Sequence, residues 1–236
     1  MECSALYCYY IPTSLHEACI NFPGSAERRS LHHFSPMRLR IFIDFWNFSL
    51  NWNERAAGGQ CDWTKLPLAL LSQAQGALAQ GGLGALTLEE TRIYASYEPG
   101  RESDRKLKNW LHNFLDKQAG VRVFVAERHW KKHVMHCRTC GADFAKCPKC
   151  QADFGRAAEK TVDSRIVTDL LSLAWEGAFD VALLLSSDRD FLPAVDKLQS
   201  KNFKVINATW RGHGHELAKV SWASFELDSI VSQLKR

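Results

Sequence analysis

The sequence lacks any apolar run approaching the roughly 20 residues that a helix needs to cross a bilayer. The first 36 residues also lack the basic start and unbroken apolar stretch of a secretory signal, because Pro12, Glu17 and Pro23 interrupt them. The net charge is only +4, so the totals alone do not indicate a nucleic-acid binder. These absences predict a soluble cytoplasmic protein with no membrane partner.

The eight cysteines lack the regular spacing of a disulfide framework. Four of them form two Cys-x-x-Cys pairs, Cys137 with Cys140 and Cys147 with Cys150, and the other four are scattered. In a chain without an export signal, this usage favours metal binding over disulfides, as expected in a reducing compartment.

The composition predicts a folded globular protein, with 46% hydrophobic and 24% charged residues. Residues 1–36 show no clear period, and we expect a poorly structured N-terminal extension there or, alternatively, translation that starts at Met37. Residues 37–236 are expected to form one α/β domain, with residues 131–156 inserted as a zinc ribbon. No internal repeat stands out.

From residue 37 onward, strand-like and helix-like segments alternate, which predicts right-handed crossovers and a parallel sheet flanked by helices. The stretch Val181–Leu185 is apolar at every position, as expected of a central strand that helices cover on both faces. We expect strands at 39–45, 88–97, 121–126, 181–186 and 203–208, and helices at 63–78, 101–117, 161–175 and 191–200.

Acidic residues stand where two of these strands end, and ligands of open parallel sheets bind beyond the carboxyl ends of strands. Asp44 ends the first strand and is followed by Asn47, whereas Asp188 and Asp190 follow the central strand. If the two strands are neighbours, their carboxylates face one cleft. The alternatives are structural: Asp44 and Asp190 as helix caps, and Asp188 as a turn residue.

A third acidic segment begins the helix before the central strand. Lys160 and Asp163 are three residues apart and share a helical face, whereas Asp169 falls roughly 240° beyond Asp163. The alternatives are that Asp163 complements the helix dipole and that Asp169 pairs with Arg165. Lys160 is either a phosphate contact or a solvated charge. Asp169 and Lys160 are therefore additional candidates for the site.

Clustered carboxylates repel each other by about 4 kcal/mol at 4 Å and an effective dielectric near 20, so a cation is needed to offset the repulsion. Mg²⁺ favours a few carboxylates together with waters and phosphate oxygens. The chemistry that follows is metal-assisted hydrolysis of a phosphodiester.

The acidic motifs carry a family resemblance. Asp44-x-x-Asn47, Lys160-x-Val162-Asp163 with Asp169, and Ser187-Asp188-Arg189-Asp190-Phe191 together resemble the NYN domain, the LabA-like branch of the PIN-like nucleases, over about residues 38–231 without the cysteine insert. The resemblance implies a PIN-like fold and Mg²⁺- or Mn²⁺-dependent RNA cleavage. It implies that Asp44, Asp163, Asp188 and Asp190 are metal ligands or water activators, with Asn47 orienting the site. Ser186-Ser187 and Thr161 replace residues that are commonly glycine in the family.

The two cysteine pairs supply four thiolates, the ligand set of a closed structural Zn²⁺ site. A redox Cys-x-x-Cys needs only one pair, and His133 or His136 could replace one ligand. A site closed by four thiolates leaves no open coordination position, so the zinc is expected to hold structure.

The insert is also basic. Trp130 precedes it and offers an aromatic face for a base, as in the recognition of single-stranded nucleic acid. A docking site for a partner protein is the competing interpretation. The candidate phosphate contacts are Lys131, Lys132, Arg138, Lys146 and Lys149.

The sequence therefore predicts a metal-dependent endoribonuclease-like phosphodiesterase. The alternative is a catalytically inactive module of the same fold that binds RNA or protein. A phosphatase of the haloacid dehalogenase type is excluded, because Asp44-Phe45-Trp46 lacks the second aspartate that its first strand would carry. His213 and His215 follow the last expected strand and are expected in a solvated loop.

Overall fold

The computed structural model describes residues 35–80, 84–158 and 161–236. The described residues belong to one compact unit, Phe34–Arg236. The extension expected at 1–36 lies outside them, apart from residues 35 and 36, and so does Lys160. Across these ranges, no helix has the length and apolar character needed to span a membrane.

Six parallel strands form the central sheet, in the order β10-β9-β8-β1-β2-β3, which confirms the predicted fold class. Strands β1 and β8 lie in the middle, as the apolar sequence of β8 predicted. The strands are β1 (Met37–Asp44), β2 (Leu86–Tyr97), β3 (Val121–Glu127), β8 (Val181–Leu185), β9 (Lys204–Thr209) and β10 (Ala223–Glu226).

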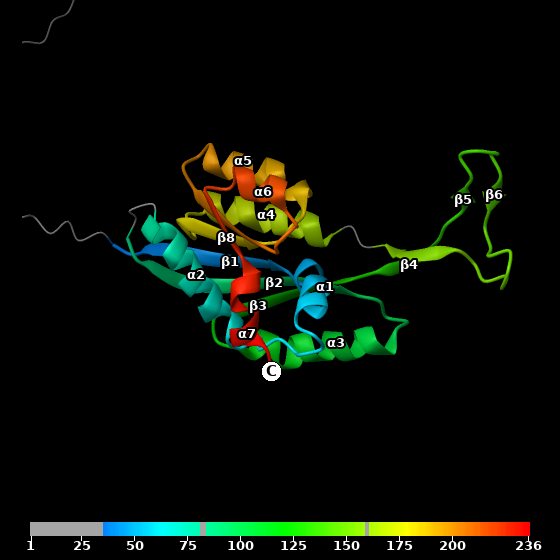
Figure 1. Ribbon diagram of the computed structural model, residues 1–236, viewed down its shortest axis with the longest axis horizontal. Helices are drawn as coiled ribbons and strands as arrows, with labels where there is room; N and C mark the ends of the chain where they lie inside the picture. Colours follow the sequence, from blue (N-terminus) through cyan, green and yellow to red (C-terminus); the bar gives the residue numbers. More distant parts are fainter. Residues whose placement is uncertain (1–34, 81–83, 159–160) are drawn as a thin grey trace, which may run out of the picture. The chain divides into compact units, whose positions relative to one another are not determined.

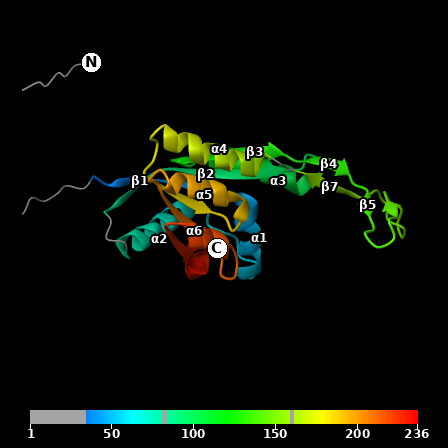
Figure 2. The same cartoon turned by 90° about the horizontal axis from the view of Figure 1, so that it is seen from above.

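Helices cover both faces of the sheet, as Figures 1 and 2 show. One face carries α1 (Phe45–Arg55), α2 (Leu66–Gln80), α3 (Glu102–Asn113) and α7 (Val231–Leu234), with short 3-10 turns at Leu115–Lys117 and Leu227–Ile230. The other carries α4 (Val162–Trp175), α5 (Leu192–Gln199) and α6 (His215–Val220), with a 3-10 turn at Arg189–Phe191.

The alternation of side chains along β1 explains the two cores. Ile41 and Ile43 pack with α1 and α2 on one face, whereas Phe42 packs against Phe179 and α4 on the other. All three β1 side chains are fully buried, and burying a side chain of this size contributes roughly 1.5–3 kcal/mol. The edge of the sheet where β1 and β8 end is therefore held from both sides.

Helix α1 differs from the sequence-based expectation, which placed no helix directly after the first strand. Its composition is polar, but Phe45, Phe48 and Trp52 are all buried and stand three and four residues apart, so they form a narrow apolar face. The helix begins at Phe45, immediately after Asp44. The residue that closes the strand therefore also caps a helix.

An antiparallel ribbon is inserted between β3 and α4. Strand β4 (His129–Lys132) pairs with β7 (Gly155–Ala158), and β5 (Met135–His136) pairs with β6 (Asp143–Phe144). The trace enters the ribbon directly from β3 and returns from β7 towards α4 (Figure 1).

Candidate active site

Strands β1 and β8 meet at the point where the order of the strands reverses. From β1 the chain builds outward through β2 and β3, and it then returns beside β1 and builds outward in the other direction through β9 and β10. In open parallel sheets, such a switch point opens a crevice at the carboxyl ends of the strands. Asp44 is the last residue of β1, and Ser186, Ser187 and Asp188 follow β8. The fold therefore places the two acidic segments at this crevice.

Asp44 is the N-cap of α1, so its position is fixed from both of its oxygens. Oδ1 accepts a hydrogen bond from the backbone N–H of Asn47 at 3.1 Å, and Oδ2 accepts one from the Oγ of Ser186 at 3.2 Å. Ser186 Oγ in turn accepts the backbone N–H of Asp188 at 3.2 Å. A single serine hydroxyl thus links the two predicted aspartates.

Burial raises the pKa of Asp44 to about 6, and the negative charges of Asp163 and Asp188 add to the rise. Its hydrogen bonds with Asn47 and Ser186 oppose the shift and do not cancel it. Two carboxylates from other elements thus lie close enough to disfavour the charged form of Asp44. A bound cation would favour that form.

Asp163 lies in the first turn of α4 and is exposed to solvent. Helix α4 contacts both β1 and the 3-10 turn that follows Asp188, and the charge of Asp163 adds to the rise in the pKa of Asp44. The first turn also suits a carboxylate on electrostatic grounds, because the dipole of α4 favours negative charge there. The interpretation as a dipole partner and the interpretation as a site residue are therefore compatible.

Asp188 and Asp190 take different parts in the loop after β8. Asp188 is the N-cap of the 3-10 turn, and its Oδ1 accepts the backbone N–H of Asp190 at 2.9 Å. The N-cap of α5 is Phe191, so the alternative interpretation of Asp190 as that cap is wrong. Asp190 is exposed, whereas Asp188 is half-buried.

Asp169 lies among cations on the inner side of α4. Its Oδ2 accepts hydrogen bonds from Arg92 Nη1 and the Tyr94 hydroxyl, each at 2.9 Å, and its Oδ1 lies 3.0 Å from Arg165 Nε. The carboxylate is buried, and these partners meet its need for hydrogen bonds. The geometry gives Asp169 a structural environment distinct from that of Asp44.

Residues of β9 and the following loop support the crevice, and the acidic motifs gave no sign of them. The Asn207 side chain is fully buried and donates to the backbone oxygens of Leu184 and Ser186, at 3.1 and 2.9 Å. Thr209 Oγ1 lies 2.9 Å from Ser187 Oγ. A polar pair on an otherwise apolar strand, Asn207 and Thr209, is the sequence signal that could have revealed this support.

Gly214 packs directly against the loop that carries Asp188. Its φ is +65°, and an added Cβ would lie 2.5 Å from Thr209 Oγ1 and 2.9 Å from Ser187 Cα. Only glycine combines this backbone conformation with so close an approach. His213 lies in an exposed loop, as expected, whereas His215 was wrongly expected there: it is exposed but begins α6. Gly214, between them, packs against the Asp188 loop.

The acidic side chains suit a hard cation by their oxygen chemistry and by the mutual repulsion that raises the pKa of Asp44. Within the ranges that the structure describes, no three acidic, histidine or cysteine side chains lie close enough together to hold a metal ion. Mg²⁺ and Mn²⁺ are cations that accept a few carboxylates and keep several waters.

The inserted ribbon contains an internal repeat of ten residues, which corrects the expectation that the chain has none. Residues 137–146 read CRTCGADFAK and residues 147–156 read CPKCQADFGR. Cys137 N donates to Ala142 O at 2.9 Å, and Cys147 N donates to Ala152 O at the same distance. The two segments thus fold as copies of one hairpin.

Each copy holds its first cysteine in a turn that favours the thiolate. Backbone N–H groups of Cys140 and Thr139 lower the pKa of Cys137, and those of Cys150 and Lys149 lower the pKa of Cys147. The four cysteines are divided between two turns, and the structure does not gather them into one ligand group. His136, the alternative ligand, has its Nδ1 2.7 Å from Asp143 Oδ1.

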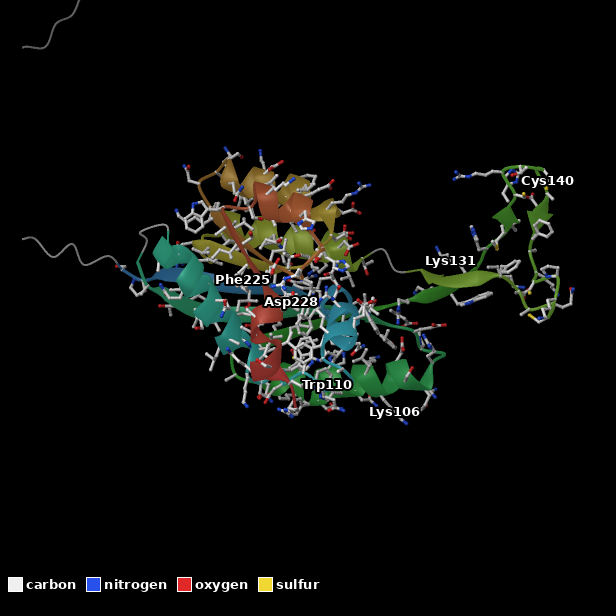
Figure 3. All side chains as sticks on the ribbon, in the orientation of Figure 1. Lys106, Trp110, Lys131, Cys140, Phe225 and Asp228 are labelled. Carbon is white, nitrogen blue, oxygen red and sulfur yellow. The ribbon has the colours of Figure 1, made fainter. Side chains whose placement is uncertain are left out.

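The basic residues of the ribbon are exposed, as a role in phosphate binding requires. Figure 3 shows Lys131 on the β4 and β7 ladder and Cys140 in the turn between β5 and β6. Lys132 Nζ lies 3.0 Å from Asp153, which offsets part of its charge. The Trp130 ring is 47% exposed and lies on Gly155, where an added Cβ would overlap it. The exposed basic residues are Lys131, Lys132, Arg138, Lys146 and Lys149.

Comparison with known proteins identifies one family. A model of the NYN domain matches residues 38–222, most of the described chain. No curated protein matches the sequence. Among solved structures, a protein of unknown function, VPA0982 from Vibrio parahaemolyticus RIMD 2210633, is 16% identical with a TM-score of 0.47. That match covers 81% of this chain and 93% of the other.

Proposed function

Because this chain belongs to the NYN domain family, we propose that it is a metal-dependent nuclease that hydrolyses phosphodiester bonds of RNA or other single-stranded nucleic acid. The observation that carries the proposal is the link from Asp44 through Ser186 to Asp188 at the switch point of the sheet, where the charge of Asp163 also raises the pKa of Asp44. The family is one of PIN-like nucleases. The LabA-like branch is the finer assignment that the motifs favour.

Asp44, Asp163, Asp188 and Asp190 are the residues proposed to hold Mg²⁺ or Mn²⁺. When bound, the metal lowers the pKa of water and stabilises charge on the phosphate oxygens. The protein side chains position the metal ligands and the substrate. Asn47 and Ser186 fix both oxygens of Asp44, so this ligand is preorganised before substrate arrives.

The acidic side chains of the proposed site differ in their exposure to solvent. Asp44 is buried, whereas Asp163 and Asp190 are exposed, so the acidic crevice has a closed inner side and an open outer side. We propose that the phosphate approaches from the side of the exposed carboxylates. Lys160, a further candidate contact, lies outside the described residues, and Asp169 remains a lesser candidate because cations already surround it.

Cleavage assays with matched variants test the proposal. Labelled single-stranded RNA and DNA are incubated with Mn²⁺ and wild type, Asp44→Asn, Asp188→Asn or Asp196→Asn, an exposed aspartate of α5 as control. We expect wild type and Asp196→Asn to cleave RNA, and the two site variants to lose at least 100-fold in rate. Cleavage that persists in both site variants would overturn the assignment of the site.

A catalytically inactive binding module of the same fold is the second candidate, and the exposed basic and aromatic residues of the ribbon favour it. Thermal unfolding with and without Mn²⁺ separates the two candidates. A ligand that binds only the folded protein raises the melting temperature. A rise in wild type that Asp44→Asn abolishes, without cleavage of any substrate, would support the binding module and contradict hydrolysis.

The ribbon is proposed to bind one structural Zn²⁺ through Cys137, Cys140, Cys147 and Cys150. The supporting observation is the repeat, whose two turns each direct backbone N–H groups at a cysteine. One ion would join the two hairpins and fix the spacing of the basic residues between them.

Zinc content tests this part. Protein purified without added metal is analysed for wild type, Cys137→Ser with Cys147→Ser, and Cys61→Ser, a cysteine outside the ribbon. We expect one zinc per chain in wild type and in Cys61→Ser, and none in the double variant. Zinc that persists in the double variant contradicts the site.

The competing role of the ribbon, docking a partner protein, predicts that Lys131→Ala leaves RNA affinity unchanged.

A further inference from the structure

A groove of about 590 Å³ lies beside the acidic crevice, between β3 and α4. These are the elements through which the chain enters and leaves the ribbon. The groove wall formed by α4 includes Thr161, Val162 and Ser164, which flank Asp163 in the sequence. The wall formed by β3 belongs to the edge strand of the sheet and includes Phe124. The groove therefore lies next to Asp163, at the start of α4.

Arg165 is the cation of this groove, and its orientation is fixed. Its Cζ lies 4.7 Å from the centre of the Phe124 ring, and its Nε lies 3.0 Å from Asp169 Oδ1. The side chain is nevertheless 52% exposed. A guanidinium stacked on a ring and held by a carboxylate loses little further freedom when it binds a ligand.

The layer beneath Arg165 is rigid. Phe124 stacks on Tyr94, with ring centroids 5.2 Å apart and an interplanar angle of 12°. Tyr94 in turn donates to the buried Asp169, which also pairs with Arg92. The Phe124 ring and the Asp169 carboxylate thus hold the Arg165 guanidinium in place. Positioning Arg165 is a role for the buried Asp169.

A planar guanidinium with an aromatic ring on one side is a platform for a nucleobase on the other side. Such a base must be unpaired, because bases within a duplex are already stacked and paired. The hydroxyl-bearing residues Ser164 and Thr168 line the same groove and add polar groups beside the platform. The chemistry of the groove therefore suits a nucleotide of a single strand.

We propose that this groove binds an unpaired nucleotide of the RNA substrate next to the scissile phosphate, with its base stacked on Arg165. The proposal deepens the proposed function and rests on it for the identity of the substrate. In this proposal, Arg165 gives the protein its preference for single-stranded over duplex RNA. Arg165 is then a binding residue that touches substrate and takes no part in hydrolysis.

Binding is measured apart from cleavage, in the Asp44→Asn background, by fluorescence anisotropy of a labelled 12-nucleotide RNA at fixed salt. The same RNA annealed to its complement serves as the duplex ligand. Stacking of one base on an aromatic or guanidinium face changes affinity by about 10-fold. We expect Arg165→Ala and Arg165→Lys to weaken single-strand binding by about 10-fold and to leave duplex binding unchanged.

Arg165→Lys keeps the charge and removes the plane, so it separates stacking from simple attraction. Arg105→Lys, at an exposed arginine of α3 on the other face of the sheet, is the matched control. Thr168→Trp fills the groove with a bulky side chain one helical turn from Arg165 and should also weaken single-strand binding. Circular dichroism confirms that each variant is folded.

The outcomes separate this proposal from the proposed function. Wild type that cleaves RNA while Arg165→Lys and Thr168→Trp bind single strands like the parent would overturn the groove and leave the nuclease intact. Arg165-dependent binding with no cleavage by wild type would support the groove and contradict hydrolysis. Equal loss of single-strand and duplex affinity in Arg165→Ala, with full affinity in Arg165→Lys, would reduce the residue to a phosphate contact and overturn the proposal.

Discussion

The side-chain oxygen of Asn47 accepts a hydrogen bond from the backbone N–H of Ser187 at 3.0 Å, which joins the ends of β1 and β8 across 140 residues of sequence. The backbone N–H of the same asparagine donates to Asp44. Asn47 thus sets the distance between the two acidic loops while it also orients one of the carboxylates.

Replacement of Asn47 by alanine removes the link and leaves the strands intact. We expect a stability loss of about 1 kcal/mol, typical of one hydrogen bond, and a 10- to 100-fold loss in the rate of RNA cleavage. Urea unfolding and single-turnover kinetics measure the two effects. Asn51→Ala, one turn further along α1, is the control. Equal effects of the two substitutions would show that Asn47 has no special role.

The raised pKa of Asp44 predicts how stability depends on pH in protein stripped of metal by EDTA. The folded protein holds this proton up to about pH 6, whereas the unfolded chain releases it near 3.8. Stability from Asp44 is therefore full below pH 4 and falls as pH rises to 6, by about 3 kcal/mol for a shift of about two units.

Asp44→Asn removes this loss because asparagine stays neutral. In EDTA, we expect the variant to be more stable than wild type at pH 8, with the difference vanishing near pH 4. Denaturant titrations at both pH values measure it, with Asp190→Asn as an exposed control. A variant that is less stable than wild type at pH 8 would show that burial does not dominate the environment of Asp44.

Asp169 offers a contrast between structural and chemical roles. Asp169→Ala leaves the buried Arg92 without one carboxylate partner, and breaking a buried ion pair costs about 3–5 kcal/mol. We expect this loss in thermal or urea unfolding, together with cleavage per folded molecule within a few-fold of wild type at low temperature. Full stability combined with abolished cleavage would instead place Asp169 in the catalytic set.

Gly214 and Gly212 form a natural pair for testing the support of the Asp188 loop. Both have positive φ, at +65° and +81°, but an added Cβ meets Ser187 and Thr209 only at Gly214. Gly212→Ala should cost about 1 kcal/mol from backbone strain alone. Gly214→Ala should cost more and should also slow cleavage at least 10-fold. Unfolding curves and cleavage rates of the two variants provide the comparison, which fails if they match.

Much of the fold follows from local pattern. The apolar run of β8 and the alternation of segments predict a parallel sheet, and Asp44 and Asp188 mark strand ends without any knowledge of tertiary contacts. Helix α1 escaped prediction because Phe45, Phe48 and Trp52, which form its apolar face, stand among asparagines that suggest a loop. Tertiary packing, rather than helix propensity, stabilises it.

The support of the site was harder to predict because its partners are distant in sequence. Asp169 meets Arg92 across 77 residues and Asn207 meets Ser186 across 21, and no periodicity encodes such pairs. The hairpin repeat of the ribbon is the opposite case. The sequence itself contains this repeat, because Ala-Asp-Phe follows each cysteine pair after one intervening residue. Cysteine spacing alone does not reveal it.

The pairing of β4 with β7 brings the two ends of the ribbon together. His129 faces Ala158 across the ladder, so the ribbon begins and ends at adjacent points of the backbone. The ribbon strands pair only with each other, in ladders separate from the six-stranded sheet that carries Asp44. The repeated hairpin is thus a side branch of the fold, joined to the sheet only through the paired strands at its base.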